Sequence, residues 1–346
     1  MARRELATNL RGMRAVLLND YGSSEQLVLA DVPPPPEPRA GEVLVKVAYG
    51  GLRWGDIMQR NGFPSRARPT PFIAGQEAAG VVERVGAGVT AFRPGMRVVA
   101  LPLQGAWAEY VSVPEARLHV LPERASLAQA LAYPVNLLTA YYAVIEWTKI
   151  QPGERVLLHA AAGGVGLLAL QIMKRRLRDV TVVALVGSER KRACALSHGA
   201  DHVIDYKQAD YVTEINQLFG PKASGFASGG ERGGGVDVSL NGVSGKTLET
   251  DPQVIRKRGR WLIYGWAGGR GRLDTSAFGY DGITIMPFSS IAWLGTPEHR
   301  AGLHFVRDWL EREPLLEPSI YPLADAPQAT RAMELGETMG KVVFEV

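Results

Sequence analysis

From Met13 to about Val120, short runs rich in apolar residues are separated by turn-forming residues. Short apolar runs bounded by turn formers are typical of strands, so each run predicts a strand. The predicted strands span residues 14–18, 42–48, 79–85 and 97–100. Turns rich in glycine and proline, such as Pro94-Gly95, lie between them. This spacing predicts a compact β-rich domain or a partial barrel.

From about Val135 to Pro287, apolar strands alternate with helical segments. The predicted strands span residues 155–160, 180–186, 202–205, 236–240, 260–264 and 283–286. The predicted helices span residues 165–177, 189–198 and 212–219. Such alternation predicts a doubly wound parallel sheet of the Rossmann type, and therefore an α/β fold. Residues 220–235 include seven glycines and predict a flexible surface loop whose role the sequence leaves open.

The segment from residue 296 to residue 346 contains predicted helices at 298–311 and 326–335 and predicted strands at 316–321 and 341–345. On its own it is too short to bury much apolar surface. We therefore expect it to fold back onto the β-rich domain. The sequence thus predicts a β-rich domain of residues 1–134 with 296–346 and a Rossmann domain of residues 135–295.

The composition narrows the class of protein. The chain has 346 residues, of which 46% are hydrophobic and 21% charged, as is typical of two globular domains. Its single cysteine, Cys194, excludes an internal disulfide and a multi-cysteine metal cage. The formal net charge of +4 is spread along the chain, and residues 1–12 lack the apolar core of a secretory signal. With no apolar run near the ~20 residues of a membrane helix, we expect a cytoplasmic protein without nucleic-acid or membrane partners.

The strongest chemical signal is the segment 160–166, Ala-Ala-Ala-Gly-Gly-Val-Gly, which follows an apolar strand and opens an apolar helix. In a dinucleotide-binding turn, Gly163 would let the pyrophosphate approach the backbone, and Gly166 would let the helix pack tightly on the sheet. Ala161 stands where the first glycine of the motif usually stands. The alternative is a close-packed structural turn. The cofactor-binding residues predicted here are Ala161, Gly163, Gly164, Val165 and Gly166.

The end of the second Rossmann strand indicates which dinucleotide binds. A site for NAD usually carries Asp or Glu there, whereas this chain has Val186-Gly187-Ser188. Donors and positive charges that suit a 2′-phosphate follow instead, at Ser188, Arg190, Lys191 and Arg192. In the alternative interpretation, Ser188 only caps a helix and the basic residues form a solvated face. We expect NADPH in preference to NADH.

Several motifs follow one another in order over nearly the whole chain. They are Gly51-Leu52-Arg53-Trp54-Gly55-Asp56, Ala74-Gly75-Gln76-Glu77-Ala78-Ala79-Gly80, Leu138-Thr139-Ala140-Tyr141, Gln151-Pro152-Gly153-Glu154, the turn at 160–166, and Gly340-Lys341-Val342-Val343. In these motifs the chain resembles the medium-chain dehydrogenases/reductases, specifically the zinc-independent quinone oxidoreductases. The segment 134–166 is also similar to vesicle amine transport protein homologues and to the enoyl reductase domains of polyketide synthases. The resemblance implies a Rossmann domain and a GroES-like β-rich domain.

The resemblance also bears on metal binding. Zinc-dependent members of the superfamily carry a cysteine where this chain has Arg53 and a histidine where it has Gln76. A guanidinium is in practice no zinc ligand, and an amide is a poor one. The histidines, including His119, His159 and His202, show no ligand spacing. We therefore expect no metal, and hydride transfer without a Lewis acid favours quinones or activated alkenes over alcohols.

The resemblance implies a role for individual residues. It places Thr139 and the turn glycines along the nicotinamide and the pyrophosphate, and it places Ser188, Lys191 and Tyr206 at the 2′-phosphate. Further cofactor contacts are implied at Asn241, Gly242, Tyr264, Gly265 and Lys341. The residues implied to face the substrate from the β-rich domain are Arg53, Trp54, Asp56 and Phe63. Arg53 replaces the usual asparagine, so it would steer an anionic substrate; alternatively, it pairs structurally with Asp56 or Glu77.

The catalytic residues, including the proton donor, stay unassigned. Relatives that reduce enoyl thioesters often carry a tyrosine where this chain reads Asn61-Gly62-Phe63-Pro64, and this difference favours a quinone. Tyr133, Tyr141 and Tyr142 occur at positions typical of packing.

The sequence therefore predicts an NADPH-dependent, zinc-free reductase that transfers hydride to a quinone or an activated alkene. A stand-alone enoyl thioester reductase is the leading enzyme alternative. A non-catalytic NADPH-binding protein with a transport-associated or structural role is an alternative of another class. We expect a homodimer that acts on a small-molecule substrate.

Overall fold

The computed structural model describes residues 12–63, 67–223 and 233–346. The expected tail at residues 1–11 and residues 224–232 of the glycine-rich loop lie outside the described residues. The chain forms two compact units: unit 1 comprises Met1–Pro134 with Trp309–Val346, and unit 2 comprises Val135–Asp308. Each unit has a hydrophobic core of its own.

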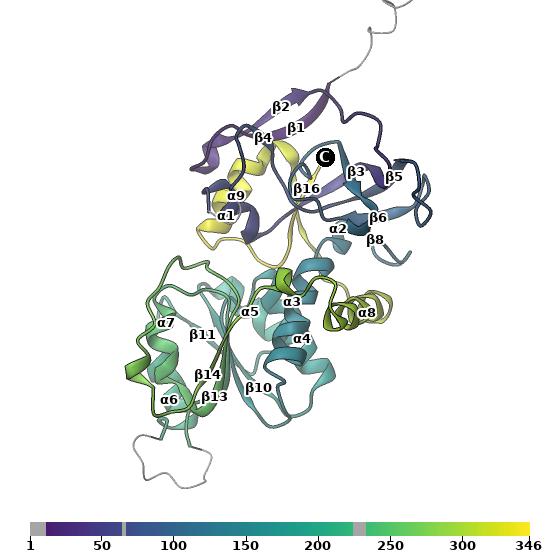
Figure 1. The fold of residues 1–346 in the computed structure, drawn as a ribbon. Coiled ribbons are helices and arrows are strands. Elements are labelled where there is room, and N and C mark those ends of the chain that lie inside the picture. The colour runs from purple at the N-terminus through teal and green to yellow at the C-terminus, as the bar shows by residue number, and fades with distance from the viewer. Residues whose placement is uncertain (1–11, 64–66, 224–232) are drawn as a thin grey trace, which may run out of the picture. The chain divides into compact units, whose positions relative to one another are not determined.

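Unit 1 is rich in strands (Figure 1). Its larger sheet has the order β15-β16-β3-β5-β6-β8, and β7 also pairs with β3. These strands are β3 (Glu42–Leu52), β5 (Ala78–Val85), β6 (Arg97–Ala100), β7 (Tyr110–Pro114), β8 (Leu118–Val120), β15 (Ser319–Pro322) and β16 (Val342–Glu345). The smaller sheet has the order β2-β1-β4, with β1 at Met13–Leu18, β2 at Leu27–Val32 and β4 at Phe72–Ile73. The helices of this unit include α1 (Trp54–Arg60), α2 (Leu127–Ala130) and α9 (Ala326–Glu334).

Trp107 is buried in the unit 1 core and explains why residues 50 and 75 are glycine. Its ring packs edge-on against Phe344 with the centroids 4.8 Å apart. A Cβ on Gly75 would lie 2.2 Å from the indole, and one on Gly50 would lie 2.8 Å from it. The indole Nε1 donates to the Gly51 carbonyl at 2.9 Å. These contacts bring the β3 and 74–80 motifs together in the interior.

Within the described residues, unit 2 contains a six-stranded parallel sheet with the order β11-β10-β9-β12-β13-β14. The strands are β9 (Arg155–Leu158), β10 (Thr181–Val186), β11 (His202–Asp205), β12 (Val236–Asn241), β13 (Ile255–Ile263) and β14 (Thr284–Pro287). This order, in which the first strand lies between the second and the fourth, is that of a doubly wound Rossmann sheet. It confirms the predicted α/β fold class.

Helices cover both faces of this sheet, with α4 on one face and α6 and α7 on the other (Figure 1). The helices of unit 2 include α3 (Leu138–Tyr141), α4 (Gly164–Arg176), α5 (Glu189–Ser197), α6 (Tyr211–Phe219) and α7 (Thr247–Thr250). Two of these helices have a polar N-cap residue. Ser188 caps α5, and Asp210 caps α6 by accepting from the amides of Val212 and Thr213.

Helix α8 (Pro297–Arg312) continues along the chain from one unit into the other. The sequence assigned residues 296–308 to the β-rich domain, whereas in the structure they cluster with unit 2. Their contacts explain the difference, because Phe305 stacks on Tyr141 with the centroids 4.7 Å apart and Asp308 pairs with Arg176 at 3.1 Å. No helix among the described residues has both the length and the apolar character that crossing a membrane requires.

Candidate functional site

The turn between β9 and α4 has the geometry of an anion-binding helix start. The backbone reverses at Ala160, whose φ is +48°, and the Gly163 amide donates to the Ala160 carbonyl at 2.9 Å. Leu167 N donates to Gly163 O at 3.0 Å as the first intrahelical hydrogen bond. The amides of residues 164–166 precede that bond, so they need a partner from outside the helix. A phosphate is a suitable partner, because the helix dipole also favours negative charge there.

Gly163 and Gly166 differ in how much room their surroundings leave for a side chain. A Cβ on Gly166 would lie 2.4 Å from the Ala160 carbonyl oxygen and 2.6 Å from that of Ala161. Backbone atoms cannot move aside as a side chain does, so only glycine fits at 166. A Cβ on Gly163 would lie 3.1 Å from Ala160 O, and the φ of −83° is open to any residue. Packing therefore requires glycine at 166, whereas at 163 it requires only a small residue.

Positive charge gathers beyond the end of β10. Burial lowers the pKa of Lys191, and the charges of Lys207 and Arg190 lower it further. Tyr206 and Lys207 lie over Gly187, where a Cβ would come within 2.6 Å of the Tyr206 hydroxyl and 3.2 Å of Lys207 Cε. We call Arg190, Lys191 and Lys207 the cationic cluster. Lys207 was missed from the sequence, although its place directly after β11, beside Tyr206, is a usable signal.

Two other residues of this segment have structural partners. The Ser188 hydroxyl accepts from the Lys191 amide at 3.4 Å, so Ser188 caps α5. The Arg192 guanidinium donates to the Val203 carbonyl at 2.6 Å, which ties the side chain to β11. Of the basic residues proposed for the phosphate, Arg190 and Lys191 belong to the cationic cluster, and Arg192 does not.

Three predicted residues meet at the carboxyl ends of β12 and β13. The Tyr264 ring lies against Gly242, where a Cβ would lie 2.8 Å from the ring. A Cβ on Gly265 would lie 2.2 Å from the Gly242 carbonyl oxygen, so the two backbones are in close contact. Burial raises the pKa of the Tyr264 phenol. Strand ends of this kind are where open α/β sheets bind ligands.

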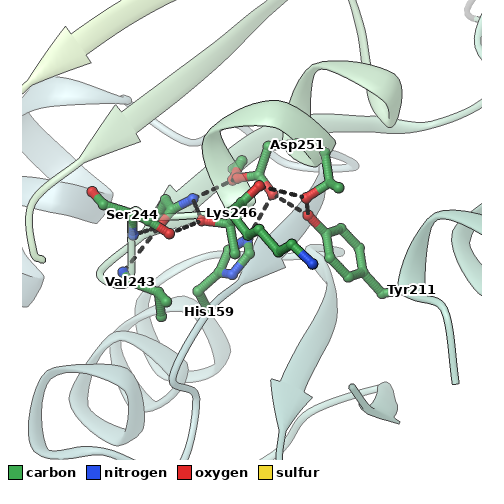
Figure 2. Close-up of polar contacts among 10 residues, drawn as sticks. His159, Tyr211, Val243, Ser244, Lys246 and Asp251 are labelled. Atoms are coloured by element: carbon green, nitrogen blue, oxygen red, sulfur yellow. Dashed lines mark hydrogen bonds and ion pairs between the residues drawn. The ribbon is translucent and has the colours of Figure 1, made fainter. Parts of the chain in front are cut away.

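The Asn241 side chain, in contrast, lines no ligand surface. It is fully buried, and its amide joins a network with Asp251, Thr247 and the amides of Val243 and Ser244 (Figure 2). All polar atoms of this side chain have partners inside the protein, so the predicted contact of Asn241 with the cofactor would have to come from its backbone. Sequence reasoning also missed His159 and Tyr211, which join the same network.

In unit 1, the two positions that hold zinc ligands in zinc-dependent relatives lie side by side. Arg53 Nη2 donates to Gln76 Oε1 at 2.6 Å, and Gln76 Nε2 donates to Gln59 at 3.0 Å. Arg53 Nε lies 4.0 Å from Glu77, and the Arg53 amide donates to Asp56 at 2.9 Å at the start of α1. Burial lowers the pKa of Arg53, and the Asp56 charge opposes this effect. These contacts support the structural alternative for Arg53.

Lys341 is buried in the interior of unit 1. Its side chain is 1% exposed, and its ammonium forms an ion pair with Glu77, which is equally buried, and donates to the Leu52 carbonyl at 3.2 Å. The ammonium is therefore engaged inside unit 1, and the contact of Lys341 with the cofactor stays a prediction. Burial lowers the pKa of Lys341, and the nearby Arg53 charge acts in the same direction.

The remaining predicted residues are half-buried. Trp54 is the first residue of α1, and Phe63 follows that helix, with its amide donating to the Met58 carbonyl at 2.9 Å. Thr139 lies in α3, and its hydroxyl donates to the Val135 carbonyl at 2.7 Å. The π-helical segments Tyr133–Leu137 and Tyr142–Trp147, which the sequence did not predict, flank α3.

The three candidate tyrosines have packing roles. The Tyr133 hydroxyl accepts from the Leu316 amide at 2.7 Å, and the Tyr141 hydroxyl donates to Glu146. Tyr142 is fully buried against Tyr141 and Phe288, and burial raises the pKa of its phenol to about 12. Over the described residues, no three His, Cys, Asp or Glu side chains cluster closely enough to hold a metal ion.

Comparison with known proteins agrees with this architecture. Residues 39–123 match the family model described as alcohol dehydrogenase GroES-like domain, and residues 164–305 match the one described as zinc-binding dehydrogenase. The chain is 32% identical to the quinone oxidoreductase of Rattus norvegicus over 264 residues, which are 76% of each protein. The chain therefore belongs to the quinone oxidoreductase group of the medium-chain dehydrogenase/reductase superfamily.

Two further proteins are similar. The chain is 35% identical to the synaptic vesicle membrane protein VAT-1 homolog of Rattus norvegicus over 74% of its own length, although the match spans only 60% of that protein. The structure of Escherichia coli quinone oxidoreductase complexed with NADPH superimposes with a TM-score of 0.84 at 27% identity. That superposition covers 96% of this chain and all of the bacterial one.

Proposed function

We propose that this protein is a reductase that binds NADPH and transfers hydride to a quinone or an activated alkene without a metal ion. The cationic cluster beyond β10 is the observation that carries the proposal, because no carboxylate stands at the end of that strand to favour NADH. The complex of the related Escherichia coli enzyme with NADPH supports the choice of cofactor.

The residues present fit this cofactor. The amides of residues 164–166 would receive the pyrophosphate, and Lys191 and Lys207 would neutralise the 2′-phosphate. Gly242, Tyr264 and Gly265 would contact the cofactor at the strand ends. When bound, NADPH supplies the hydride, and the protein orients it and excludes water. The tyrosines near the motif are engaged in packing, so the proton that a quinone needs would come from water.

The function is tested by following NADPH oxidation with a panel of quinones, enones and enoyl thioesters. We expect turnover with quinones or enones. A clear preference for enoyl thioesters would establish the alternative enzyme class instead. Tight NADPH binding without turnover of any of these compounds would identify a non-catalytic NADPH-binding protein.

Replacing Lys191 by alanine should raise the Kd for NADPH about 10-fold or more, because a charge-assisted contact to phosphate contributes roughly 1.5–3 kcal/mol. The Kd for NADH should stay nearly constant, since NADH lacks the 2′-phosphate. Arg192→Ala is a matched control: it removes the same charge one residue further along α5, but its guanidinium bonds to Val203. Equal loss of affinity for both cofactors in Lys191→Ala would contradict the assignment.

A further inference from the structure

Asp251 is the centre of a buried hydrogen-bond network in unit 2. It is fully buried and follows α7 directly along the chain. Among the described residues, its carboxylate accepts four hydrogen bonds, and Figure 2 shows His159 and Tyr211 pointing toward it. Oδ1 accepts from His159 Nε2 at 2.9 Å and from the Tyr211 hydroxyl at 2.7 Å. Oδ2 accepts from Ser239 at 2.7 Å and from Asn241 Nδ2 at 2.8 Å.

The partners of Asp251 favour an ionised carboxylate. Burial acts to raise the pKa of Asp251, but the His159 charge and the hydrogen bonds from His159, Tyr211 and Ser239 together hold that pKa below its ordinary value. An ionised carboxylate only accepts hydrogen bonds, so His159 carries its proton on Nε2. The side chain thus presents acceptors to every partner that surrounds it.

The carboxylate fixes the orientation of the Asn241 amide. Asn241 Nδ2 donates to Asp251 Oδ2 and to Thr247 Oγ1, both at 2.8 Å, so the amide oxygen must face the opposite way. There it accepts from the amides of Val243 at 2.9 Å and Ser244 at 2.8 Å. A flipped amide would turn its NH₂ group toward those two backbone donors, and both hydrogen bonds would be lost.

The turn that Asn241 holds is conformationally demanding. Ser244 has a φ of +59°, in the left-handed region that residues with a Cβ rarely adopt. Gly245 also has a φ of +59°, and a Cβ there would lie 2.3 Å from the Gly268 carbonyl oxygen. The Ser244 hydroxyl donates to the Gly265 carbonyl, and the Gly268 amide donates to the Val243 carbonyl, both at 2.7 Å. The turn after β12 therefore sets the position of the turn after β13.

We propose that Asp251 is a positioning residue for cofactor binding: through Asn241 it holds the turns at residues 242–245 and 264–268 in the conformation that receives NADPH. Both side chains are fully buried, so they act through the backbone of the turns and not by contact with the cofactor. This inference rests on the proposed function, because the turns are assigned to NADPH there.

The first test replaces Asp251 by asparagine, which nearly preserves the volume but converts one acceptor atom into a donor. Asn241 Nδ2 would then face an NH₂ group or lose its orientation, and we expect the Kd for NADPH to rise about 10-fold or more, the effect of losing one or two buried hydrogen bonds. Tyr211→Phe is the matched control. It removes one donor from Oδ1 and leaves the contact with Asn241 intact, so the Kd should change less than about 3-fold.

The second test exchanges the two groups in the variant Asp251→Asn/Asn241→Asp. Residue 251 would keep an oxygen toward His159 and Tyr211 and would present its NH₂ group to a carboxylate at 241. That carboxylate would still accept from the amides of Val243 and Ser244. We expect the double variant to recover NADPH affinity to within about 3-fold of the native protein, because the contact between residues 241 and 251 is restored. The hydroxyls of Ser239 and Thr247 can rotate, so that Ser239 accepts from the NH₂ group at 251 and Thr247 donates to the carboxylate at 241. A folded double variant that binds NADPH no better than Asp251→Asn would overturn the inference. If Asp251→Asn does not fold, the double variant is compared with the native protein instead, and a folded double variant with clearly weaker NADPH binding would overturn the inference.

Amide hydrogen exchange at Val243 and Ser244, measured without cofactor, separates this inference from the proposed function. Exchange should be faster in Asp251→Asn and should return to the native rate in the double variant. Unchanged exchange in Asp251→Asn would contradict the positioning role even if NADPH affinity fell. If the native protein does not bind NADPH, the proposed function fails, while the exchange rates still report whether Asp251 holds the turn.

Discussion

Replacing Lys341 by methionine should lower the free energy of unfolding by about 3–5 kcal/mol, because it leaves a buried carboxylate without its closest cation. Lys341 and Glu77 are each 1% exposed and form an ion pair inside unit 1. The remaining cation, Arg53, approaches Glu77 only to 4.0 Å. Chemical denaturation followed by fluorescence would measure the change.

Two controls isolate the effect of burial. The Arg84–Glu37 ion pair is exposed, with side chains 51% and 73% accessible, so Arg84→Ala should cost less than about 1 kcal/mol. The double variant Lys341→Met/Glu77→Leu removes both buried charges and should recover much of the loss. A cost below about 1 kcal/mol for Lys341→Met alone would show that the Glu77 carboxylate does not depend on Lys341.

Gly166→Ala should mainly lower stability, whereas Gly163→Ala should mainly weaken cofactor binding. At 166 the methyl group would overlap two carbonyl oxygens, and we expect a loss of about 1–3 kcal/mol in the free energy of unfolding, as for other overpacked sites. At 163 the nearest atom would be 3.1 Å away, so a shift of a few tenths of an ångström would accommodate the methyl group with little loss of stability. If Gly163 faces the pyrophosphate, the same methyl group should instead raise the Kd for NADPH at least 10-fold.

Thermal unfolding and NADPH titration of both variants would check this pair of predictions. Gly163→Ala with native affinity for NADPH would mean that the cofactor does not approach the backbone at this glycine. Gly166→Ala with native stability would mean that the turn can open away from α4.

The six strands of the unit 2 sheet and helices α4, α5 and α6 could be predicted from the sequence, because continuous apolar runs mark buried parallel strands, whereas α3 and α7 were missed. The prediction for β11, residues 202–205, has the observed limits, and that for α5 differs by one residue. In unit 1, strands β2, β4, β7 and β8 and helices α1 and α2 were missed. Helix α1 has only seven residues, and its N-cap position holds Arg53, whose amide bonds to Asp56, instead of a usual capping residue.

The sequence by itself determined the α/β class and the glycine turn before α4, and it offered the helix cap at Ser188 as an alternative. Each of these depends on residues close together in the chain, whose periodicity and backbone preferences act locally. Only the tertiary structure decided that Lys341 pairs with Glu77, 264 positions away, that Arg53 bonds to Gln76, and that Asp251 orients Asn241. A buried charge must find a partner wherever the packed chain brings one, and no local pattern records which residue that is.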